Sequence, residues 1–429
     1  MNGMDRTMHS QSNPFLSESA VLSQFPGFGP TRARQLAGYL SVGDDGGGWL
    51  YFWFSEAAIA PESAPLIIWI NHAPEQNALG CLFDGHGPYL LGDGGRVHAN
   101  PFSWHQHAHY LIIDQPLGHG LSFAIHPRYQ PENHAEGSQQ VYLALQEFFL
   151  RWPRYRQQAC YLFGLGQACH TIAHLARRIL DGNQCGQPQI HLLGLGLGNA
   201  WLAPEIQLQS EIEFAAQHRL IRGDELGKAQ ALLQDFRQVL ASTSPLRQQR
   251  STRLALELEA YLERCSGRDA RDIRQPPRRA ASRLADFLDK PGTRQALHID
   301  PRAQASTAPW PQSSWLESPS ALFPPLLEKL NILFFHGEYG MLGNHLGLDV
   351  WLNTLLWSQA EAFRQQKPTE WRPYGLPAGT IRRLSGLSHV LIHNSGQHIA
   401  RDQPANALAM LRQYLQTKEA IAYPAPYII

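Results

Sequence analysis

The sequence predicts an α/β protein with a mostly parallel central sheet flanked by helices, interrupted in the middle of the chain by a helical insertion. Two observations predict this class. Short apolar runs alternate with longer segments of helical spacing along most of the 429 residues. Between about residues 202 and 311 the strand signals vanish, and Gln, Arg, Glu and Leu dominate instead.

The predicted strands are continuous apolar runs, as expected for strands buried on both faces of a sheet. They lie at residues 49–54, 65–71, 110–114, 159–163, 190–194, 330–335 and 387–392. Segments 137–152 and 170–181 carry Leu, Ile, Phe and Ala at helical spacing and predict helices. The last predicted helix, 404–417, begins at a proline, which fits the first turn of a helix.

The change in composition divides the chain into three parts. We expect the first part of the α/β core over residues 15–201, a helical cap over 202–311, and the second part of the core over 312–429. Inside the cap, the run Pro276-Pro277-Arg278-Arg279 interrupts the helical pattern.

The charge balance predicts neither a nucleic-acid nor a membrane partner. Lys plus Arg and Asp plus Glu both total 36, so no basic field attracts anions. No apolar run approaches the ~20 residues that a membrane span needs, and residues 1–14 lack the apolar stretch of a signal peptide. The five cysteines are scattered, odd in number and without a CxxC pair, which argues against a disulfide framework and predicts a reduced, cytoplasmic setting.

Several short motifs follow one another along the chain. They are Ala37-Gly38-Tyr39-Leu40, Asn100-Pro101-Phe102-Ser103-Trp104, Asp114-Gln115-Pro116-Leu117-Gly118, Gly196-Leu197-Gly198-Asn199, Asp272-Ile273-Arg274, Gly396-Gln397-His398 and Asp402-Gln403-Pro404. In this order and at this spacing they resemble motifs of the serine carboxypeptidases, the S10 peptidase family. The resemblance covers about Phe28 to Leu415 and implies an α/β-hydrolase fold with a helical cap.

The same resemblance places the catalytic positions of the family on residues that cannot perform the chemistry. The family's G-E-S-Y-A-G-H is matched by residues 164–170, so its serine falls on Gly166, which has no atom that can attack a carbonyl. Its aspartate falls on Gly340, and only its histidine is kept, as His398. The resemblance therefore predicts a carboxypeptidase fold that is no longer a carboxypeptidase.

The resemblance also outlines a changed binding pocket. The family's asparagine is kept as Asn71, but the two glutamates that bind a substrate carboxylate fall on Gly85 and Leu165. The backbone N–H groups that form the family's oxyanion hole correspond to Ala73 and Gln167. With Gly166 and Gly340, these positions are expected to line a pocket that is wider than the family's.

Other side chains near these positions have competing interpretations. Glu338 is the nearby carboxylate that would orient His398, while His398 itself is either an acid/base group or a packed remnant. Asn71 either contacts a ligand or stabilises its own turn. The adjacent pair Cys169-His170 predicts packing rather than catalysis, because neighbouring residues on a helix face apart.

Metal and nucleotide sites are not predicted. The sequence has 20 histidines, including His72, His86, His119 and the alternating 105/107/109 set, yet no metal-ligand motif. Residues 194–199 lack the G-x-G-x-x-G spacing of a dinucleotide loop. We therefore expect neither a metal nor a cofactor.

The favoured hypothesis is an enzyme of non-hydrolytic type, a cyclase, lyase, dehydratase or isomerase that acts on a small metabolite in natural-product biosynthesis. The chemical positions are replaced while the scaffold motifs stay legible, which random decay does not explain. The alternative is an inert pseudopeptidase that holds a ligand, a protein partner or a second copy of the chain. Residual hydrolysis through Glu338, Cys169 or a water is the least favoured interpretation.

Overall fold

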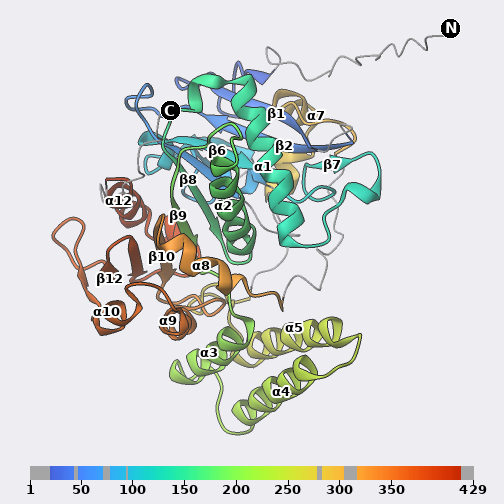
Figure 1. The fold of residues 1–429 in the computed structure, drawn as a ribbon. Coiled ribbons are helices and arrows are strands. Elements are labelled where there is room, and N and C mark those ends of the chain that lie inside the picture. Colours follow the sequence, from blue (N-terminus) through green and yellow to red (C-terminus); the bar gives the residue numbers. More distant parts are fainter. Residues whose placement is uncertain are drawn as a thin grey trace.

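A computed structural model describes residues 20–42, 47–70, 78–92, 95–277, 283–303 and 316–416. Within these residues one large sheet has the strand order β1-β2-β6-β3-β8-β9-β10-β13-β12-β11, and β7 pairs with β2 (Figure 1). Its strands are β1 (Gln35–Val42), β2 (Gly48–Ser55), β3 (Leu66–Ile70), β6 (His109–Ile113), β7 (Phe123–Ala124), β8 (Cys160–Leu165), β9 (Leu192–Gly198), β10 (Asn331–Gly337), β11 (Thr369–Trp371), β12 (Gly379–Leu384) and β13 (Leu387–Ile392). A separate pair consists of β4 (Tyr89–Leu91) and β5 (Val97–Ala99).

The centre of the sheet is parallel, as predicted. From β6 through β3, β8, β9 and β10 to β13, each strand runs parallel to its neighbour. The flanking strands β1, β2, β11 and β12 pair antiparallel. The carboxyl ends of β8, β9, β10 and β13 therefore lie side by side, at the edge where open α/β sheets bind ligands.

Strand β9 is longer than the sequence predicts. It begins at Leu192 and continues to Gly198, past the predicted end at residue 194. Its glycines face aromatic side chains of the neighbouring strands: a Cβ at Gly196 would lie 2.1 Å from Phe163, and one at Gly198 would lie 2.2 Å from Phe335. Packing therefore requires glycine at these two positions. Because glycine is depleted in strands in general, the sequence pattern does not predict a strand there.

Helices cover both faces of the sheet. On one face lie α1 (His134–Arg151), α2 (Ala168–Gln184) and α8 (Phe323–Leu327), whose apolar residues share a core with β3 and β8. On the other face α11 (Ile399–Asp402) and α12 (Pro404–Leu415) pack on a second core rich in Trp and Tyr. Helices α9 (His345–Thr354) and α10 (Ala360–Gln365) follow β10 in the chain.

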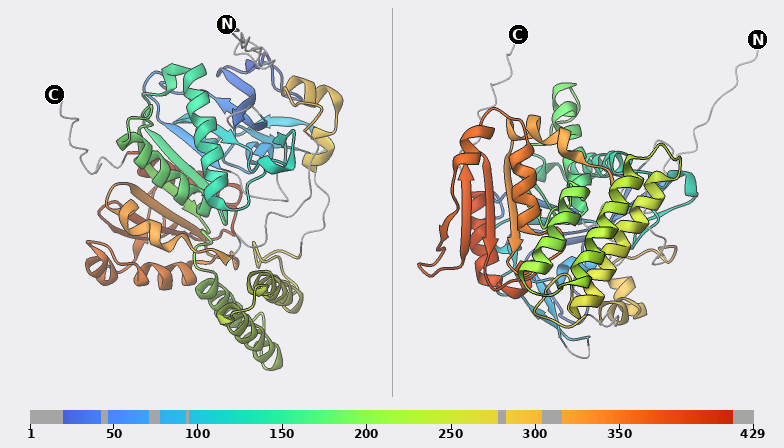
Figure 2. Two further views of the ribbon diagram at one scale, coloured as in Figure 1. Left: turned by 45° about the vertical axis from the view of Figure 1, so that its right-hand side comes forward. Right: turned by 90° about the horizontal axis from the view of Figure 1, so that it is seen from below.

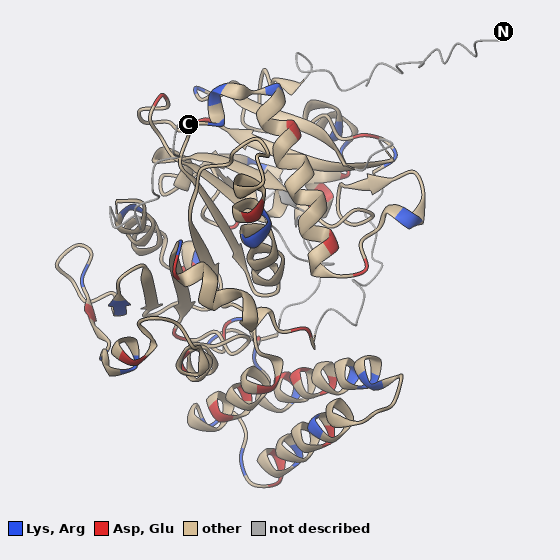
Figure 3. Ribbon diagram, in the orientation of Figure 1, with Lys and Arg blue, Asp and Glu red and all other residues tan. Residues whose placement is uncertain are grey.

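Three long helices follow β9 in the chain. Helices α3 (Pro204–Gln217), α4 (Asp224–Ala241) and α5 (Arg247–Ser266) share their own apolar core and project from the sheet (Figures 1 and 2). Helices α4 and α5 carry charged residues of both signs, whereas the charged residues of α3 are all acidic (Figure 3).

The second part of the predicted cap packs elsewhere. Helices α6 (Arg283–Leu288) and α7 (Pro291–Ala296) lie near β1 and β2, where Tyr51 Oη donates to Leu297 O at 2.9 Å. The ring of Phe287 lies 5.6 Å from that of Phe83. The segment predicted as one cap thus contributes to two apolar cores.

Among the described helices, none has both the length and the apolar character to cross a bilayer.

Candidate functional site

The chain makes a sharp turn at Gly166, between β8 and α2. Gly166 has φ +57°, the left-handed conformation that side chains rarely adopt. The residues two before and two after it are small because the turn is crowded: a Cβ at Gly164 would lie 2.8 Å from Ile172 Cδ1 and 3.0 Å from Ala168 Cβ. This is the strand-turn-helix geometry that presents a nucleophile in α/β-hydrolases. A Cβ at Gly166 would meet no atom of the described residues within 4 Å.

Gly340 lies beside the segment that carries His398. It belongs to the loop after β10, and a Cβ there would lie 3.0 Å from Asn199 Nδ2 and 3.3 Å from the backbone nitrogen of Gln397. A carboxylate at this position would therefore stand next to the histidine loop. That Gly340 stands in the place of the family's aspartate remains a prediction.

His398 is buried directly before α11, in a loop held by several backbone bonds. Gly396 N–H donates to Asp402 Oδ2 at 2.8 Å, and Gln397 N–H donates to Arg271 O at 2.7 Å. These bonds fix the backbone directly before His398.

The segment Asp272-Ile273-Arg274 ties the end of the helical insertion to this loop. Arg274 donates to Asp272 at 2.8 Å, to Asn394 O at 2.8 Å and to Asp402 at 3.3 Å. Burial by itself raises the pKa of Asp272, but its bonds with Arg274 outweigh this and lower the pKa below its ordinary value. The ion pair therefore persists at neutral pH and braces the histidine loop.

His398 and Leu165 border one small cavity. Its free volume of about 10 Å³ is close to the least that holds one water. Its walls are Trp69, Asp84, His86, Trp104, Leu165, Phe335, Gln397, His398, Ile399 and Ala400. Asp84 is thus a carboxylate on the wall of the cavity that His398 borders. The sequence analysis did not single it out, although it directly precedes Gly85, a predicted pocket residue.

The position of the first lost glutamate is occupied by backbone. Gly85 has φ +91°, and a Cβ there would lie 2.5 Å from both C and O of Ala400 in α11. Asn100 Nδ2 donates to Gly85 O at 2.7 Å and to Gly87 O at 2.8 Å, which fixes this loop against α11. The sequence analysis predicts a wider pocket at this position. The structure corrects this prediction, because the backbone of α11 closes the pocket there.

Three buried amide oxygens near the strand ends have no hydrogen-bond partner among the described residues. They are Gln167 Oε1, Asn199 Oδ1 and Gln397 Oε1. Each such acceptor costs about 1–3 kcal/mol when it is buried without a donor. The sequence carries a signal for Gln397, because this residue stands where the family motif A-G-H has glycine. It carries no such signal for Asn199, which is part of a motif that suggests only a scaffold role.

The other predicted site residues have varied surroundings. Glu338 Oε2 accepts from the N–H of Asn394 at 2.9 Å, so its carboxylate braces the histidine loop, and a role in orienting the imidazole remains a prediction. Gln167 precedes α2, and two N–H groups of the first turn of that helix, those of Cys169 and His170, donate to Gly166 O and Gln167 O. Asn71 and Ala73 lie outside the described residues.

The pair Cys169-His170 serves packing, as expected. Cys169 is fully buried, and burial raises the pKa of its thiol well above the ordinary value, so little thiolate forms at neutral pH. The ring of His170 lies 4.7 Å from that of His134. Within the described part of the chain, no group of three or more His, Cys, Asp or Glu residues could hold a metal ion.

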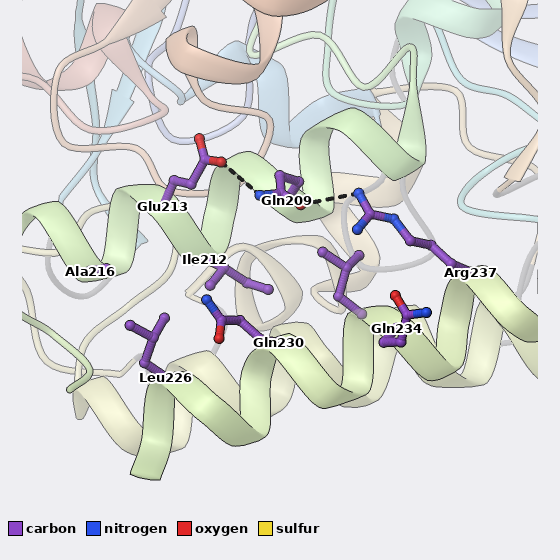
Figure 4. Close-up of a pocket in the computed structure, with 9 residues that line it drawn as sticks. Gln209, Ile212, Glu213, Ala216, Leu226, Gln230, Gln234 and Arg237 are labelled. Carbon is purple, nitrogen blue, oxygen red and sulfur yellow. Dashed lines mark hydrogen bonds between the residues drawn. The ribbon is translucent and has the colours of Figure 1, made fainter. Parts of the chain in front are cut away.

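A larger hollow of about 390 Å³ lies between α3 and α4 (Figure 4). Three of its polar side chains bond to one another: Gln209 donates to Glu213 at 2.7 Å and accepts from Arg237 at 3.1 Å. Arg237 also pairs with Glu205 at 2.9 Å. These groups are satisfied without a ligand, in contrast to the amide oxygens at the strand ends.

His86 gives the site a measurable dependence of stability on pH. Burial lowers its pKa from 6.5 to about 3. Between these values the unfolded chain binds a proton that the folded chain does not, so stability that is complete above pH 6.5 is lost as pH falls, by about 1.4 kcal/mol per pH unit. We expect His86→Phe to reduce the slope of stability against pH by up to about 1.4 kcal/mol per pH unit between pH 4 and 6.5 in denaturant titrations. The slope does not vanish, because burial also lowers the pKa values of His105, His336 and His345.

Phenylalanine suits this experiment because His86 stacks on Trp69 at 4.0 Å between ring centroids. The variant loses the bond between His86 Nδ1 and Tyr110 Oη (2.7 Å), which lowers stability at all pH values but not its slope. His98→Phe, at an exposed position, is the control. An unchanged slope in His86→Phe would contradict the assignment.

Comparison with known proteins gives consistent results along the chain. A family model described as serine carboxypeptidase matches residues 26–417. A serine carboxypeptidase S10 family member from Dictyostelium discoideum is 26% identical and covers 90% of this chain and 95% of its own length. A serine carboxypeptidase-like protein from Oryza sativa subsp. japonica is 27% identical and covers 85% and 88%.

Among solved structures, a prohormone-processing carboxypeptidase from Saccharomyces cerevisiae matches with a TM-score of 0.78. The match covers 93% of this chain and 96% of the yeast chain at 19% identity. It confirms the predicted α/β-hydrolase fold, with its mostly parallel sheet flanked by helices.

Proposed function

The chain belongs to the serine carboxypeptidase family, and we propose that it does not hydrolyse peptides but performs non-hydrolytic chemistry on a small molecule. The observation that carries this proposal is Gly166, which occupies the nucleophile's turn with φ +57° and no side chain. Without an attacking atom no acyl-enzyme forms. Gly340 removes the acid that would orient the base, and the closed position at Gly85 removes part of the carboxylate pocket.

The groups that remain suit proton transfer next to a carbonyl. His398 is the acid/base group, and Asp84 is a carboxylate on the wall of the same cavity. The N–H groups at the start of the 17-residue helix α2, beginning near Gln167, would stabilise the oxyanion of an enolate. If His398 removes a proton from a carbon atom of the substrate and the proton returns to another atom, the reaction is an isomerisation. If the resulting enolate expels a neighbouring group, the enzyme is a lyase or dehydratase. If the enolate attacks another atom of the same molecule, the enzyme is a cyclase.

His398→Ala is expected to abolish turnover of the molecule that the protein transforms. A positioned acid/base group contributes about 10²–10⁴-fold to a rate, so the loss should be of that size. The measurement is mass spectrometry of metabolites from the producing cells, incubated with the purified protein. His393→Ala, five residues earlier in the same loop, is the matched control. Full turnover in His398→Ala would remove this residue from the mechanism.

The alternative is a protein without turnover that holds a ligand, a partner protein or a second copy of itself. The projecting helices favour it: α5 carries Leu256, which is 40% exposed, and Leu246 just before α5 is 58% exposed. Binding of a metabolite without chemical change, or a stable complex in size-exclusion chromatography, would support this alternative. Conversion of a metabolite would exclude it.

A further inference from the structure

A buried carboxyl group lies where helix α3 meets the loop after β10. Glu211 of α3 is 0% exposed, and its Oε1 accepts from the N–H of Gly343 at 3.2 Å. Gly343 also packs against the end of β9, because its φ is +54° and a Cβ there would lie 2.5 Å from Asn199 O. The bond from Glu211 therefore connects α3 to a closely packed loop, the one that contains Gly340.

Backbone bonds connect this loop to the one that carries His398. Met341 N–H donates to Ala270 O at 2.9 Å, in the segment that follows α5. One residue further along that segment, Arg271 O accepts from Gln397 N–H at 2.7 Å, directly before His398. A displacement of α3 would therefore act on the histidine loop through two successive contacts.

Helix α5 brings a second carboxyl group towards Glu211. Glu259 of α5 is half-buried, and burial is the main cause that raises the pKa of each of the two groups. The negative charge of Glu259 raises the pKa of Glu211 further. Arg271 opposes the shift of Glu259, and Glu263 adds to it. Two buried like charges are costly, so the pair keeps at least one proton at neutral pH.

The other two helices that pack on α3, α4 and α9, do not neutralise this pair. Arg237 of α4 pairs with Glu205 at 2.9 Å, and the remaining charged residues of α4 are exposed. On α9, burial lowers the pKa of His345 to about 4, so its ring is neutral above that pH. Asp349 of α9 bonds to His389 of β13 at 3.1 Å. Among the described residues, none forms an ion pair with either carboxyl group of the pair.

We propose that Glu211 and Glu259 form a proton-dependent latch, termed the carboxyl latch, which holds α3 on the loop after β10 and loosens as pH rises. With the proton on Oε2 of Glu211, Oε1 accepts from Gly343 and no charge is buried there. Once both groups are ionised, they repel each other and require water, so α3 separates from α5 and draws on the bond to Gly343. The latch goes beyond the proposed function and does not depend on it.

The direction of the effect on stability follows from the raised pKa values. Below the ordinary value of 4.5 the folded and unfolded chains are both protonated at these groups, and their contribution to stability is complete. Above it the unfolded chain loses protons that the folded chain keeps, so stability falls as pH rises. The equilibrium constant for unfolding then increases by up to about tenfold per pH unit for each group.

The test measures urea unfolding and backbone hydrogen exchange of the whole protein between pH 5 and 9. Glu211→Gln keeps an acceptor for Gly343 N–H but cannot ionise. We expect it to reduce the rise of the unfolding constant by up to about tenfold per pH unit. At pH 9 the amides of α3 and of residues 341–343 should exchange about tenfold more slowly in the variant than in the parent protein. Glu205→Gln, exposed on the same helix, is the control and should leave both the slope and the exchange unchanged.

Two outcomes would overturn the carboxyl latch. A slope in Glu211→Gln equal to that of the parent protein would mean that no proton is retained on folding. A reduced slope with unchanged exchange of α3 and the loop would mean that the pair affects global unfolding only. Glu259→Gln should shift both readouts in the same direction, and it decides the matter if Glu211→Gln does not fold. Neither measurement involves turnover, so the latch and the proposed function fail or succeed separately.

Discussion

The variant Gly166→Ser/Gly340→Asp should hydrolyse p-nitrophenyl acetate and react with a fluorophosphonate, whereas the parent protein does neither. No atom of the described residues lies within 4 Å of a Cβ at Gly166, so we expect the serine to fit, at a cost of about 1–2 kcal/mol for its left-handed backbone. The aspartate enters beside Asn199 and Gln397 and would orient His398. Since a positioned base contributes about 10²–10⁴-fold, we expect a gain of about 10²-fold in the rate of ester hydrolysis.

The matched control is Gly186→Ser, just beyond the other end of α2. Gly186 has φ +76° and also meets nothing within 4 Å, so the substitution introduces the same strain outside the site. It should not change esterase activity. If the parent protein reacted with the fluorophosphonate as fast as the double variant, another residue would be the nucleophile and the proposed loss of hydrolysis would be wrong.

The turn at Gly166 and the loop before His398 followed from the sequence because the motifs around them are local. The junction at 164–170 and the run 396–398 have glycines and small residues that only a few backbone conformations explain. The parallel strands followed because a strand buried on both faces is continuously apolar, as at 66–70 and 387–392.

The closed position at Gly85 and the unpaired amide oxygens at the strand ends did not follow, because both depend on contacts between distant segments. A glycine at position 85 predicts a free space, and only the fold shows that the carbonyl of Ala400, 315 residues later, fills it. The amides come from three loops spread over 230 residues, between Gln167 and Gln397, and each is an ordinary surface residue in isolation. Their orphaned oxygens exist only once the strands are ordered side by side.

Gly85→Ala should destabilise the protein strongly and displace His398. A Cβ at this position would lie 2.5 Å from Ala400 C and O and 2.6 Å from Arg401 N, and backbone atoms cannot rotate away as a side chain can. We add about 1–2 kcal/mol for the left-handed backbone and about 1–3 kcal/mol for overpacking. Unfolding in urea should therefore show a loss of about 2–5 kcal/mol.

Gly29→Ala separates the two contributions. Gly29 has φ +100°, near the +91° of Gly85, but a Cβ there meets nothing within 4 Å. Its loss of stability should equal the backbone strain alone, and its histidine spectrum should match the parent's. In Gly85→Ala the signals of His398 should shift, because Ala400 and Arg401 belong to the helix that the histidine precedes. Equal losses in the two variants would mean that α11 yields easily, and that a glutamate could still stand at position 85 in a pocket open to a carboxylate.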